Sequence, residues 1–461
     1  MSNQLIHPLL QEIGSLFARN GKQVFLVGGA VRDMLLRRPC SDWDLATDAR
    51  PEEVNAIFRG TRQRVNIIPT GIKHGTVTVI YRDASIEITT FRTESAYRDG
   101  RHPEEVRFSS SIEEDLSRRD FTMNALALGL PGGRLVDPFG GEADMRNRII
   151  RCVRNPAERF AEDGLRALRA VRFAAQLGFE VEAATLAAIG GALDTTAKVS
   201  AERIRDELDK IISSPKPSAA FLLMEKTGLL PLILPELALC RGVEQKGYHR
   251  FDVLEHSLLA CDYAARKKYP RETALAALFH DIGKVKTRKL GGDGVWTFYQ
   301  HERESGVLAG DILFRLRYPG AVIEKTVHLI EEHMFHYTED WTDAAVRRFI
   351  VRTGEEHLQD LYALRFCDTF GMAGVEPSPE LLFPLARRVE KVLQKGRSLS
   401  VKDLAVSGKD LIAAGMKPGK HMGIILNELL ETVLDDPEQN TREKLLEIAD
   451  NLRKRYGSIS S

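Results

Sequence analysis

The apolar pattern of the chain changes near residue 140, and this change constrains the fold more than any other feature. Before it, short strand-like runs alternate with helical runs at 24–27 (VFLV), 43–47 (WDLAT) and a hairpin over 75–92. From about residue 155 nearly every segment has helical spacing. We therefore predict an α+β protein whose mixed sheet and helices come first and whose remainder is helical.

The length of the chain predicts several domains. A chain of 461 residues exceeds what a single hydrophobic core usually supports. The turn DPFGG at 137–141 is the expected first boundary. We predict a head, a helical neck, a helical body and a helical tail, over residues 1–140, 141–215, 216–375 and 376–461.

Composition limits the location and the partners. No apolar run is long enough to span a bilayer, and the N-terminal segment lacks a signal-peptide pattern, so no membrane is expected. Five scattered cysteines are typical of a reducing compartment, which favours a cytoplasmic protein. Lys plus Arg and Asp plus Glu both total 65, so any nucleic acid must be bound by local basic patches.

Two aspartates stand one residue apart in the run SDWDLAT at 41–47, which ends in the extended stretch WDLAT. Side chains alternate along a strand, so Asp42 and Asp44 share one face. Two carboxylates this close repel each other unless a cation lies between them, and Mg²⁺ prefers such oxygen ligands. Glu87, in the hairpin, is the candidate third ligand. Just upstream, Gly28 and Gly29 form a strand-to-helix turn whose backbone N–H groups can approach a triphosphate.

Several motifs together resemble one family. The run GGAVRD followed by SDWDLAT resembles the nucleotidyltransferase signature of the DNA polymerase beta superfamily. More specifically, it is similar to the class II tRNA nucleotidyltransferases (CCA-adding enzymes) and bacterial poly(A) polymerases. The resemblance covers about the first 215 residues and continues, in the family's order, through GIKHGTVTV, TTFRTESAYRDGRHPEEVRF, EEDLSRRDFTMNALAL, LVDPFGG and RFAEDGLRALRAVRFAAQLGF. It implies a polymerase-beta-like head, a base-recognising neck and template-independent addition of CCA, from CTP and ATP, to the 3′ end of tRNA.

The resemblance also implies residue roles. Asp42 and Asp44 would be the catalytic pair that binds Mg²⁺. The nucleotide would be bound by residues of three motifs: Gly28, Gly29, Arg32 and Asp33 at the triphosphate, Arg118, Arg119 and Asp120 near the ribose, and Asp163, Arg166, Arg169 and Arg172 at the base. We expect Asp163 and Arg166 to share one helix face, at i and i+3, and Arg203 and Arg205 to buttress this pocket. By spacing alone, the arginines of this helix would instead form a solvated basic stripe.

A second set of residues lies in the helical half. His256, His280-Asp281 and Asp368 resemble the ligand pattern of the HD phosphohydrolase superfamily, and His301 and His333 are candidates for a second metal. Imidazole and carboxylate ligands suit a divalent transition metal, which activates water for attack on a phosphoester. This resemblance implies hydrolysis of 2′,3′-cyclic phosphate or 2′-phosphate ends of RNA.

Alternatives remain open at the level of sequence. An A-adding enzyme or a poly(A) polymerase would share the head motifs. The segment 95–116 looks complete, which favours CCA or A addition over CC addition, and the short C-terminus disfavours poly(A) synthesis. A different class is a metal phosphohydrolase whose N-terminal module only binds nucleotide or RNA. We expect the tail, with Arg453-Lys454-Arg455, to bind tRNA.

Overall fold

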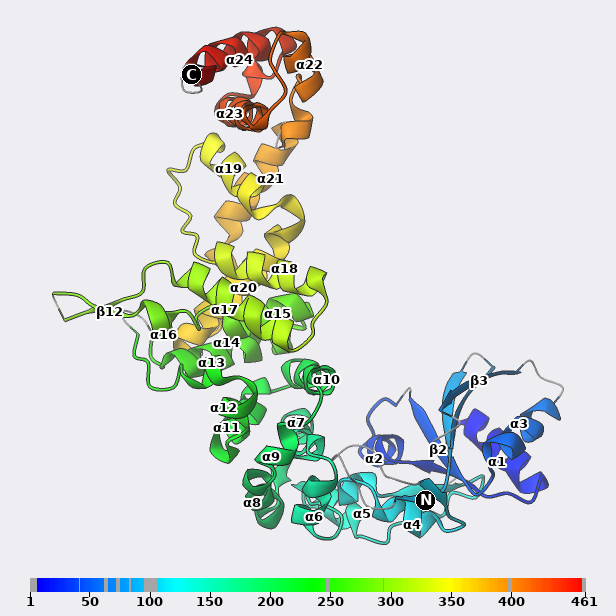
Figure 1. Cartoon of the computed structure of the whole chain (residues 1–461). Coiled ribbons are helices and arrows are strands. Elements are labelled where there is room, and N and C mark those ends of the chain that lie inside the picture. Colours follow the sequence, from blue (N-terminus) through cyan, green and yellow to red (C-terminus); the bar gives the residue numbers. More distant parts are fainter. Residues whose placement is uncertain are drawn as a thin grey trace. The chain divides into compact units, whose positions relative to one another are not determined.

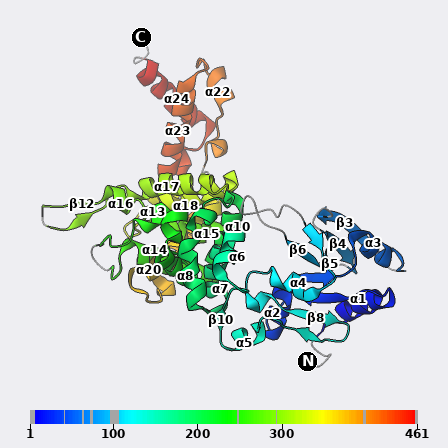
Figure 2. The same cartoon turned by 60° about the horizontal axis from the view of Figure 1, so that its bottom comes forward.

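The computed structural model describes residues 6–40, 42–61, 65–71, 75–82, 84–94, 106–245, 249–292, 294–395 and 400–457 (Figure 1). It divides into two compact units. One comprises Met1–Ala238 with Arg315–Arg317, and the other comprises Leu239–Phe314 with Tyr318–Ser461. The predicted fold class is confirmed, because the sheet lies in the N-terminal part and helices make up nearly all the rest (Figure 2).

A mixed sheet organises the first unit. Its strand order is β3-β4-β5-β2-β1-β8-β9. The bounds are β1 Val24–Val27, β2 Trp43–Thr47, β3 Val65–Gly71, β4 Thr76–Tyr81, β5 Ala84–Thr90, β8 Ala127–Leu130 and β9 Leu135–Val136. Strands β4 and β5 form the predicted antiparallel hairpin, whereas β2 pairs with β5 in parallel. A separate two-stranded sheet joins β6 Arg92–Glu94 to β7 Val106–Phe108.

One face of this sheet is covered by two amphipathic helices, α1 Pro8–Arg19 and α3 Pro51–Arg59. The rings of Phe17 and Phe58 lie 6.0 Å apart, and that of Phe58 lies 5.6 Å from Tyr81 on β4. Leu45, Ile86 and their neighbours on this face are fully buried. Because strand side chains alternate, the residues between these apolar ones must point to the opposite face.

The opposite face holds the predicted acidic residues. Asp44 on β2 is in register with Glu87 on β5, and Glu87 is in register with Thr78 on β4. Further along, this face becomes apolar and packs around Val27, Ala46 and Phe91. The alternation of side chains along β2 and β5 thus places the acidic residues on the face opposite the helices α1 and α3.

Helices complete the first unit. They are α2 Gly29–Leu35, α4 Ile112–Ser117, α5 Gly141–Arg146, α6 Pro156–Glu162, α7 Leu165–Leu177, α8 Ala183–Gly191, α9 Leu193–Thr196, α10 Ala201–Ile212, α11 Pro217–Thr227, α12 Leu229–Ile233 and α13 Pro235–Ala238. A short 3-10 helix spans Thr122–Asn124, and a parallel bridge pairs β10 Ile149–Ile150 with β11 Glu180–Val181.

The second unit is helical. It contains α14 Val253–Lys267, α15 Arg271–Phe279, α16 Lys284–Thr287, α17 His301–Arg315, α18 Gly320–Glu332, α19 Asp343–Thr353, α20 Leu358–Ala373, α21 Phe383–Lys395, α22 Gly408–Ala413, α23 Lys420–Asp435 and α24 Arg442–Gly457. The run GVWTFYQ at 294–300 interrupts the helices with β13 Trp296–Thr297, which pairs with β12 Lys289–Leu290. The C-terminal helices have a core of their own around Leu411, Leu429 and Leu445.

The three predicted domain boundaries, after residues 140, 215 and 375, stay predictions; the two compact units divide after Ala238, inside the predicted domain 216–375. In the part of the chain that the structure describes, no helix combines the length and apolar character needed to cross a bilayer.

Candidate functional site

The acidic face of the head brings three predicted ligands onto one surface. Asp44 and Glu87 are neighbours across two parallel strands, and Asp42 directly precedes β2 on the same side. All three are exposed. Desolvation by the surrounding protein and the Glu87 carboxylate raise the pKa of Asp44, and the guanidinium of Arg119 partly opposes them. Carboxylates that disfavour one another's charge in this way suit a divalent cation with oxygen ligands.

The Gly28-Gly29 turn lies where β1 meets α2. Gly28 has φ 69°, a left-handed conformation that glycine adopts without strain. A Cβ atom at this position would come within 2.6 Å of Nη1 of Arg119. The missing side chain of Gly28 therefore leaves room for the Arg119 guanidinium, and Gly29 begins the helix beside it.

Two residues predicted at the triphosphate pair with each other. Nε and Nη2 of Arg32 donate to the two carboxylate oxygens of Asp33, at 2.9 and 2.8 Å, and Nη1 donates to Asn124 at 2.8 Å. Arg32 is only 5% exposed. Its guanidinium therefore fastens α2 to the 3-10 helix, and the contact of this pair with a nucleotide stays a prediction.

The RRD segment is held by a buried carboxylate that the sequence interpretation missed. Asp115, which is 1% exposed, accepts from Arg118 at 2.8 and 3.0 Å and lies 3.4 Å from Nη2 of Arg119. Burial alone would raise the pKa of Asp115, but these two arginines lower it. Asp115 thus fixes the direction of Arg119. Its position in the first turn of α4, three residues before Arg118, is the sequence feature that could have identified it.

The expectation that Asp163 and Arg166 share one helix face is wrong. The helical pattern is interrupted at Asp163, which is extended at φ −148°, and Gly164 then begins the turn into α7. A Cβ on Gly164 would lie 2.5 Å from the backbone of Thr195 and Thr196, so α9 packs against the break. Asp163 accordingly accepts from the backbone N–H of Leu165 at the start of α7.

The arginines of α7 do not form a solvated stripe. Arg166 and Arg172 are buried, and Arg169 is partly buried. Each is paired with a carboxylate: Arg166 with Glu162 at 2.6 Å, Arg169 with Asp120 at 2.6 Å and Arg172 with Glu207 at 2.5 Å. Burial alone would raise the pKa of Asp120, but Arg169 and Asn124 hold it at about 2. The solvated alternative fails because acidic partners on other elements neutralise these charges.

Arg203 and Arg205, which were expected to support the base pocket, make different contacts in the structure. Arg203 donates to both oxygens of Asp163, at 3.1 and 2.7 Å, as expected. Arg205 instead contacts Asp206 and the backbone carbonyl of Arg317, so its buttressing role is wrong. One turn of α10 cannot direct side chains at i and i+2 to the same side.

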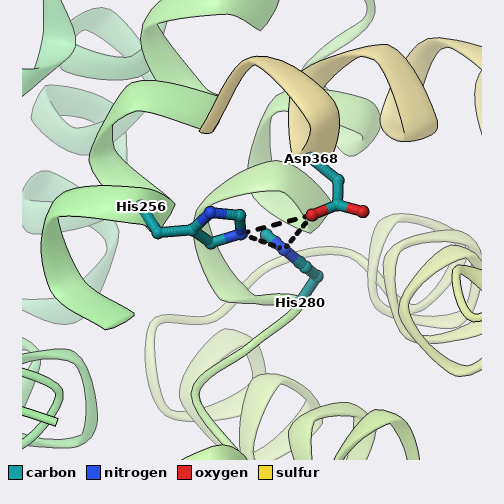
Figure 3. Close-up of side chains that lie close together, drawn as sticks. All are labelled: His256, His280 and Asp368. Carbon is teal, nitrogen blue, oxygen red and sulfur yellow. Dashed lines mark hydrogen bonds and ion pairs between the residues drawn. The ribbon is translucent and has the colours of Figure 1, made fainter. Parts of the chain in front are cut away.

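The second site gathers the predicted histidines and aspartates of the helical half. Figure 3 shows His256, His280 and Asp368 converging from α14, the end of α15 and α20. The Nε2 atoms of His256 and His280 lie 2.9 Å apart, and they lie 3.4 and 3.6 Å from Oδ1 of Asp368. These three residues, and likewise His280, Asp281 and His333, place ligand atoms within 4.8 Å of one another.

Asp281 lies at the centre of this cluster. Its Oδ2 is 3.1 Å from Nε2 of His256, and its Oδ1 is 3.2 Å from Nε2 of His301 and 4.0 Å from Nε2 of His333. All six predicted residues of this site are buried. The structure thus brings together the complete predicted set, including both candidates for a second metal.

Backbone carbonyls define the tautomers of three histidines. Nδ1 of His280, His301 and His333 lies within hydrogen-bond distance of the carbonyls of Ala277, Phe298 and Ile330, at 3.0, 2.9 and 2.6 Å. With the proton on Nδ1, each neutral ring directs an Nε2 lone pair into the cluster. Among the described residues, Nε2 of His301 and Oδ1 of Asp281 are buried without a hydrogen-bond partner. Converging lone pairs of this kind fit a metal ion.

Electrostatics in this cluster follow from its burial. Burial lowers the pKa of His333 to about 3, assisted by its neighbour His280. Burial would also lower the pKa of His280, but Asp281 and Asp368 outweigh it and raise that pKa to about 10. When no metal is bound, the two carboxylates therefore favour a proton on His280. The positive charge of that proton lies where a metal cation would otherwise balance the carboxylates.

Three further residues border the cluster and were missed from the sequence. Lys284 donates to Asp281 at 2.6 Å, and Arg365 donates to Asp368 at 3.0 Å. Each cation stands one helical turn from its aspartate, in HDIGK and RFCD. This spacing could have predicted the two ion pairs from the sequence. The ring of His249 lies 5.0 Å from that of His256, and burial lowers its pKa to about 4. The fold alone reveals His249.

Family models match three parts of the chain. Residues 24–151 match the poly A polymerase head domain, and residues 178–240 match a probable RNA- and SrmB-binding site of polymerase A. Residues 294–449 match tRNA nucleotidyltransferase domain 2.

Curated relatives match along nearly the whole chain. The CCA-adding enzyme of Anoxybacillus flavithermus is 36% identical over 432 residues, which is 94% of each chain. That of Enterococcus faecalis is 32% identical over 452 residues, covering 97% of this chain and 96% of the relative.

Solved structures agree with these relatives. The crystal structure of the Bacillus stearothermophilus CCA-adding enzyme in complex with CTP has a TM-score of 0.73 and 31% identity, and covers 98% of this chain and 100% of that one. The Thermotoga maritima CCA-adding enzyme complexed with tRNA has a TM-score of 0.56 at 19% identity, covers 97% of each chain, and supports the fold alone. With similarity of this extent across both units, the chain belongs to the family of CCA-adding enzymes, which are tRNA nucleotidyltransferases.

Proposed function

We propose that this protein adds C, C and A to the 3′ end of tRNA, with CTP and ATP as substrates and no nucleic-acid template. Membership of the CCA-adding family supports the reaction, and the crystal structure of a relative in complex with CTP supports one substrate. Five free cysteines, four of them buried, support a reducing compartment and hence action in the cytoplasm.

The observation that carries this proposal is the row formed by Asp44 and Glu87 beside the Gly28 turn. Two adjacent strands present the carboxylates, Asp42 precedes them, and Arg119 stands at the turn. Mg²⁺ bound to these carboxylates would favour ionisation of the attacking hydroxyl and neutralise charge on the leaving group.

The reaction then forms one bond and breaks one. The 3′-oxygen of the terminal ribose bonds to the α-phosphorus, and the bond from that phosphorus to the bridging oxygen breaks. Pyrophosphate leaves with the electron pair, and the hydroxyl proton passes to solvent. The role of the protein is to hold hydroxyl and phosphorus in line, which can supply several kcal/mol of the barrier reduction.

We propose that the base is recognised near Asp163 and the arginines of α7. Asp163 presents a carboxylate acceptor, which Arg203 orients with two hydrogen bonds. Arg166, Arg169 and Arg172 fix the surrounding wall through their ion pairs. A base that could not donate a hydrogen bond to Asp163 would leave that carboxylate without a partner on the base, and would therefore bind more weakly.

The test uses pure protein with tRNA lacking its tail and with tRNA ending in CC, each with CTP, ATP or both. CCA addition predicts CMP incorporation into the first and AMP incorporation into the second. Incorporation of AMP alone would instead indicate an A-adding enzyme, and long A tracts a poly(A) polymerase. Replacing Asp42 and Asp44 with Ala should abolish incorporation, and unchanged incorporation would exclude the proposed centre.

We propose a second activity at the histidine–aspartate cluster, namely hydrolysis of 2′,3′-cyclic phosphate or 2′-phosphate ends of RNA. It is favoured by the buried Nε2 lone pairs directed at Asp281. A divalent transition metal held by His256, His280, Asp281 and Asp368, with His301 and His333 available to a second ion, would supply a hydroxide nucleophile. In cyclic-phosphate hydrolysis, the oxygen of water bonds to phosphorus, one ring P–O bond breaks, and the released ribose oxygen takes the proton.

Metal content and hydrolysis test this second activity together. We expect the parent protein to retain a transition metal after dialysis and to open 2′,3′-cyclic phosphates. The His280→Ala, Asp281→Ala variant should lose both. An Asp311→Asn variant, which changes an exposed carboxylate of the helix that begins at His301, is the matched control and should retain the metal. Equal hydrolysis by the parent and the double variant would contradict the proposal.

We also propose that the tail, residues 376–461, binds tRNA. Arg453 and Lys454 both pair with Asp450 on the solvent side of α24. Phosphate contacts would compete with these exposed ion pairs, so tRNA affinity should fall with salt. Weaker tRNA binding by an Arg453→Ala, Lys454→Ala variant would support this role, and parent-like binding at each salt concentration would contradict it.

A further inference from the structure

A cavity of about 800 Å³ opens beside the histidine–aspartate cluster. Asp281, His301, His333 and Asp368 form part of its wall. This volume falls in the range of pockets that hold whole organic ligands and exceeds by several-fold what an inorganic phosphate occupies. A ligand of this cavity should therefore contain more than the group that is hydrolysed.

Two cations lie on the cluster side of the cavity. Nζ of Lys284 lies 2.6 Å from Asp281 and 2.7 Å from the side-chain oxygen of Gln245, while Arg365 pairs with Asp368. Lys284 and Arg365 both line the cavity. Donors fixed by these partners provide positive charge next to the metal-ligating atoms, and such charge favours a phosphate group there.

Two aromatic residues line another part of the same cavity. Phe298 and Tyr299 follow β13 directly. Tyr299 is 80% exposed, which is unusual for a large ring that borders a pocket. Exposed rings beside a cation-lined pocket are typical of proteins that stack nucleic-acid bases.

The aromatic pair is connected to the cluster by the backbone. The carbonyl of Phe298 lies 2.9 Å from Nδ1 of His301 and so sets the direction of that imidazole. Nζ of Lys284 also lies 5.6 Å from the centre of the Phe298 ring. These two contacts of Phe298, with His301 and with Lys284, therefore hold the aromatic pair at a fixed distance from the histidine–aspartate cluster.

We propose that this cavity binds the terminal nucleotide of an RNA, with its phosphate near Lys284 and Arg365 and its base stacked on Tyr299. The inference rests on the proposed phosphohydrolase activity and adds its specificity: the site selects phosphoesters that carry a base. Tyr299 is the residue that determines this selection, and it acts on binding rather than on the attacking water.

The experiment compares two substrates of the full-length protein loaded with Mn²⁺. One is 2′,3′-cyclic AMP, and the other is 1-O-methylribose 2′,3′-cyclic phosphate, which has the same cyclic phosphate without a base. We expect the parent to prefer the base-bearing substrate in kcat/KM. Tyr299→Ala should reduce that preference about 10-fold, the lower end of the effect of losing one base stack, mainly through KM.

Two variants and a binding measurement control this test. Tyr299→Trp keeps a stacking ring and should preserve the preference. Phe314→Ala removes an exposed aromatic of α17 outside this cavity and should leave the preference as in the parent. Calorimetric binding of 2′-AMP to metal-free protein should weaken about 10-fold in Tyr299→Ala, a readout independent of turnover.

The outcomes separate the two proposals. If the parent hydrolyses neither substrate, the phosphohydrolase activity fails, while the 2′-AMP measurement still decides on the base site. If the parent hydrolyses both substrates equally well, or if Tyr299→Ala retains the parent's preference and its affinity for 2′-AMP, the base-stacking inference is overturned and the hydrolase activity stands.

Discussion

The acidic face of the head and the histidine–aspartate cluster of the helical unit are both candidate metal sites, but they are built differently. Asp42, Asp44 and Glu87 are exposed on the face of a sheet, whereas the six residues of the cluster are buried among helices. The carboxylates of the head meet water directly, while backbone carbonyls fix three histidines of the cluster.

This difference indicates how each centre meets its metal. An open row of carboxylates holds Mg²⁺ weakly and shares it with substrate phosphates, so ion and triphosphate can arrive together. A buried cluster with oriented lone pairs is complete before any substrate arrives, so its ion should be resident. Four predictions, from the largest expected effect to the smallest, test this contrast and the buried ion pairs of the first unit.

The largest effect is expected from Asp44→Asn. Loss of one charge beside Glu87 should reduce the rate of nucleotide addition about a thousandfold, because charge stabilisation in the transition state depends on this row. Single-turnover addition of CMP to tRNA measures it. Glu52→Gln, an exposed carboxylate on α3, is the matched control. A comparable loss in the control would mean that overall charge, and not the row, matters.

The next effect concerns the stability of the first unit. Arg172→Met leaves the buried carboxylate of Glu207 with only Lys210 at 3.2 Å and Arg169 at 3.9 Å. We expect the free energy of unfolding to fall by about 3 kcal/mol in urea denaturation. Lys22→Met breaks the more exposed pair with Glu53 and should cost less than about 1 kcal/mol. Equal losses in the two variants would contradict the buried status of the α7 arginines.

Metal removal distinguishes the two centres directly. Saturating the protein with Mn²⁺ at 100 times its Kd should slow hydrogen exchange in α14, α15 and α20 by about 100-fold relative to EDTA-treated protein. The strands β2 and β5 should change far less, because their ligands face solvent. If Mn²⁺ slowed hydrogen exchange more in β2 than in α14, the idea that the cluster holds the resident ion would be contradicted.

The smallest effect is the pH dependence due to Asp120. Its pKa is about 2 in the folded protein and 3.8 without the fold, so its stabilisation is fully present above pH 4. It is lost as pH falls from 4 towards 2, and it amounts to about 2 kcal/mol. Asp120→Asn should therefore lose less stability than the parent between pH 6 and pH 3 in urea titrations. Parallel loss in the two proteins would show that another group dominates.

The sequence predicts these two centres to different depths. Alternation in SDWDLAT was enough to place Asp42 and Asp44 on one face. The position of Glu87 beside Asp44 depends on β5 pairing with β2 in parallel, which no local pattern encodes. The HD ligands followed from a resemblance, and the structure brings them together. His249 was missed because it lies in the non-helical segment just before α14, where no regular spacing predicts that its ring contacts that of His256.

The error at Asp163 has a local cause. Helical spacing of apolar residues continues through 161–177, so the periodicity predicts a single helix, and one glycine is a weak signal against it. Tertiary contact decides the outcome: Thr196 donates its hydroxyl to the carbonyl of Gly164 at 2.9 Å, and this bond holds the break between α6 and α7.

That contact restricts what can occupy position 164. With the backbone of Thr195 and Thr196 2.5 Å from the missing Cβ, even a methyl group would push α9 away and turn the Asp163 carboxylate from Arg203. In a library of variants selected for growth on CCA addition, residue 164 should therefore tolerate no replacement, while the exposed Glu158 of α6 accepts several. A single hydrogen atom in place of a side chain would then decide whether Asp163 keeps its contact with Arg203.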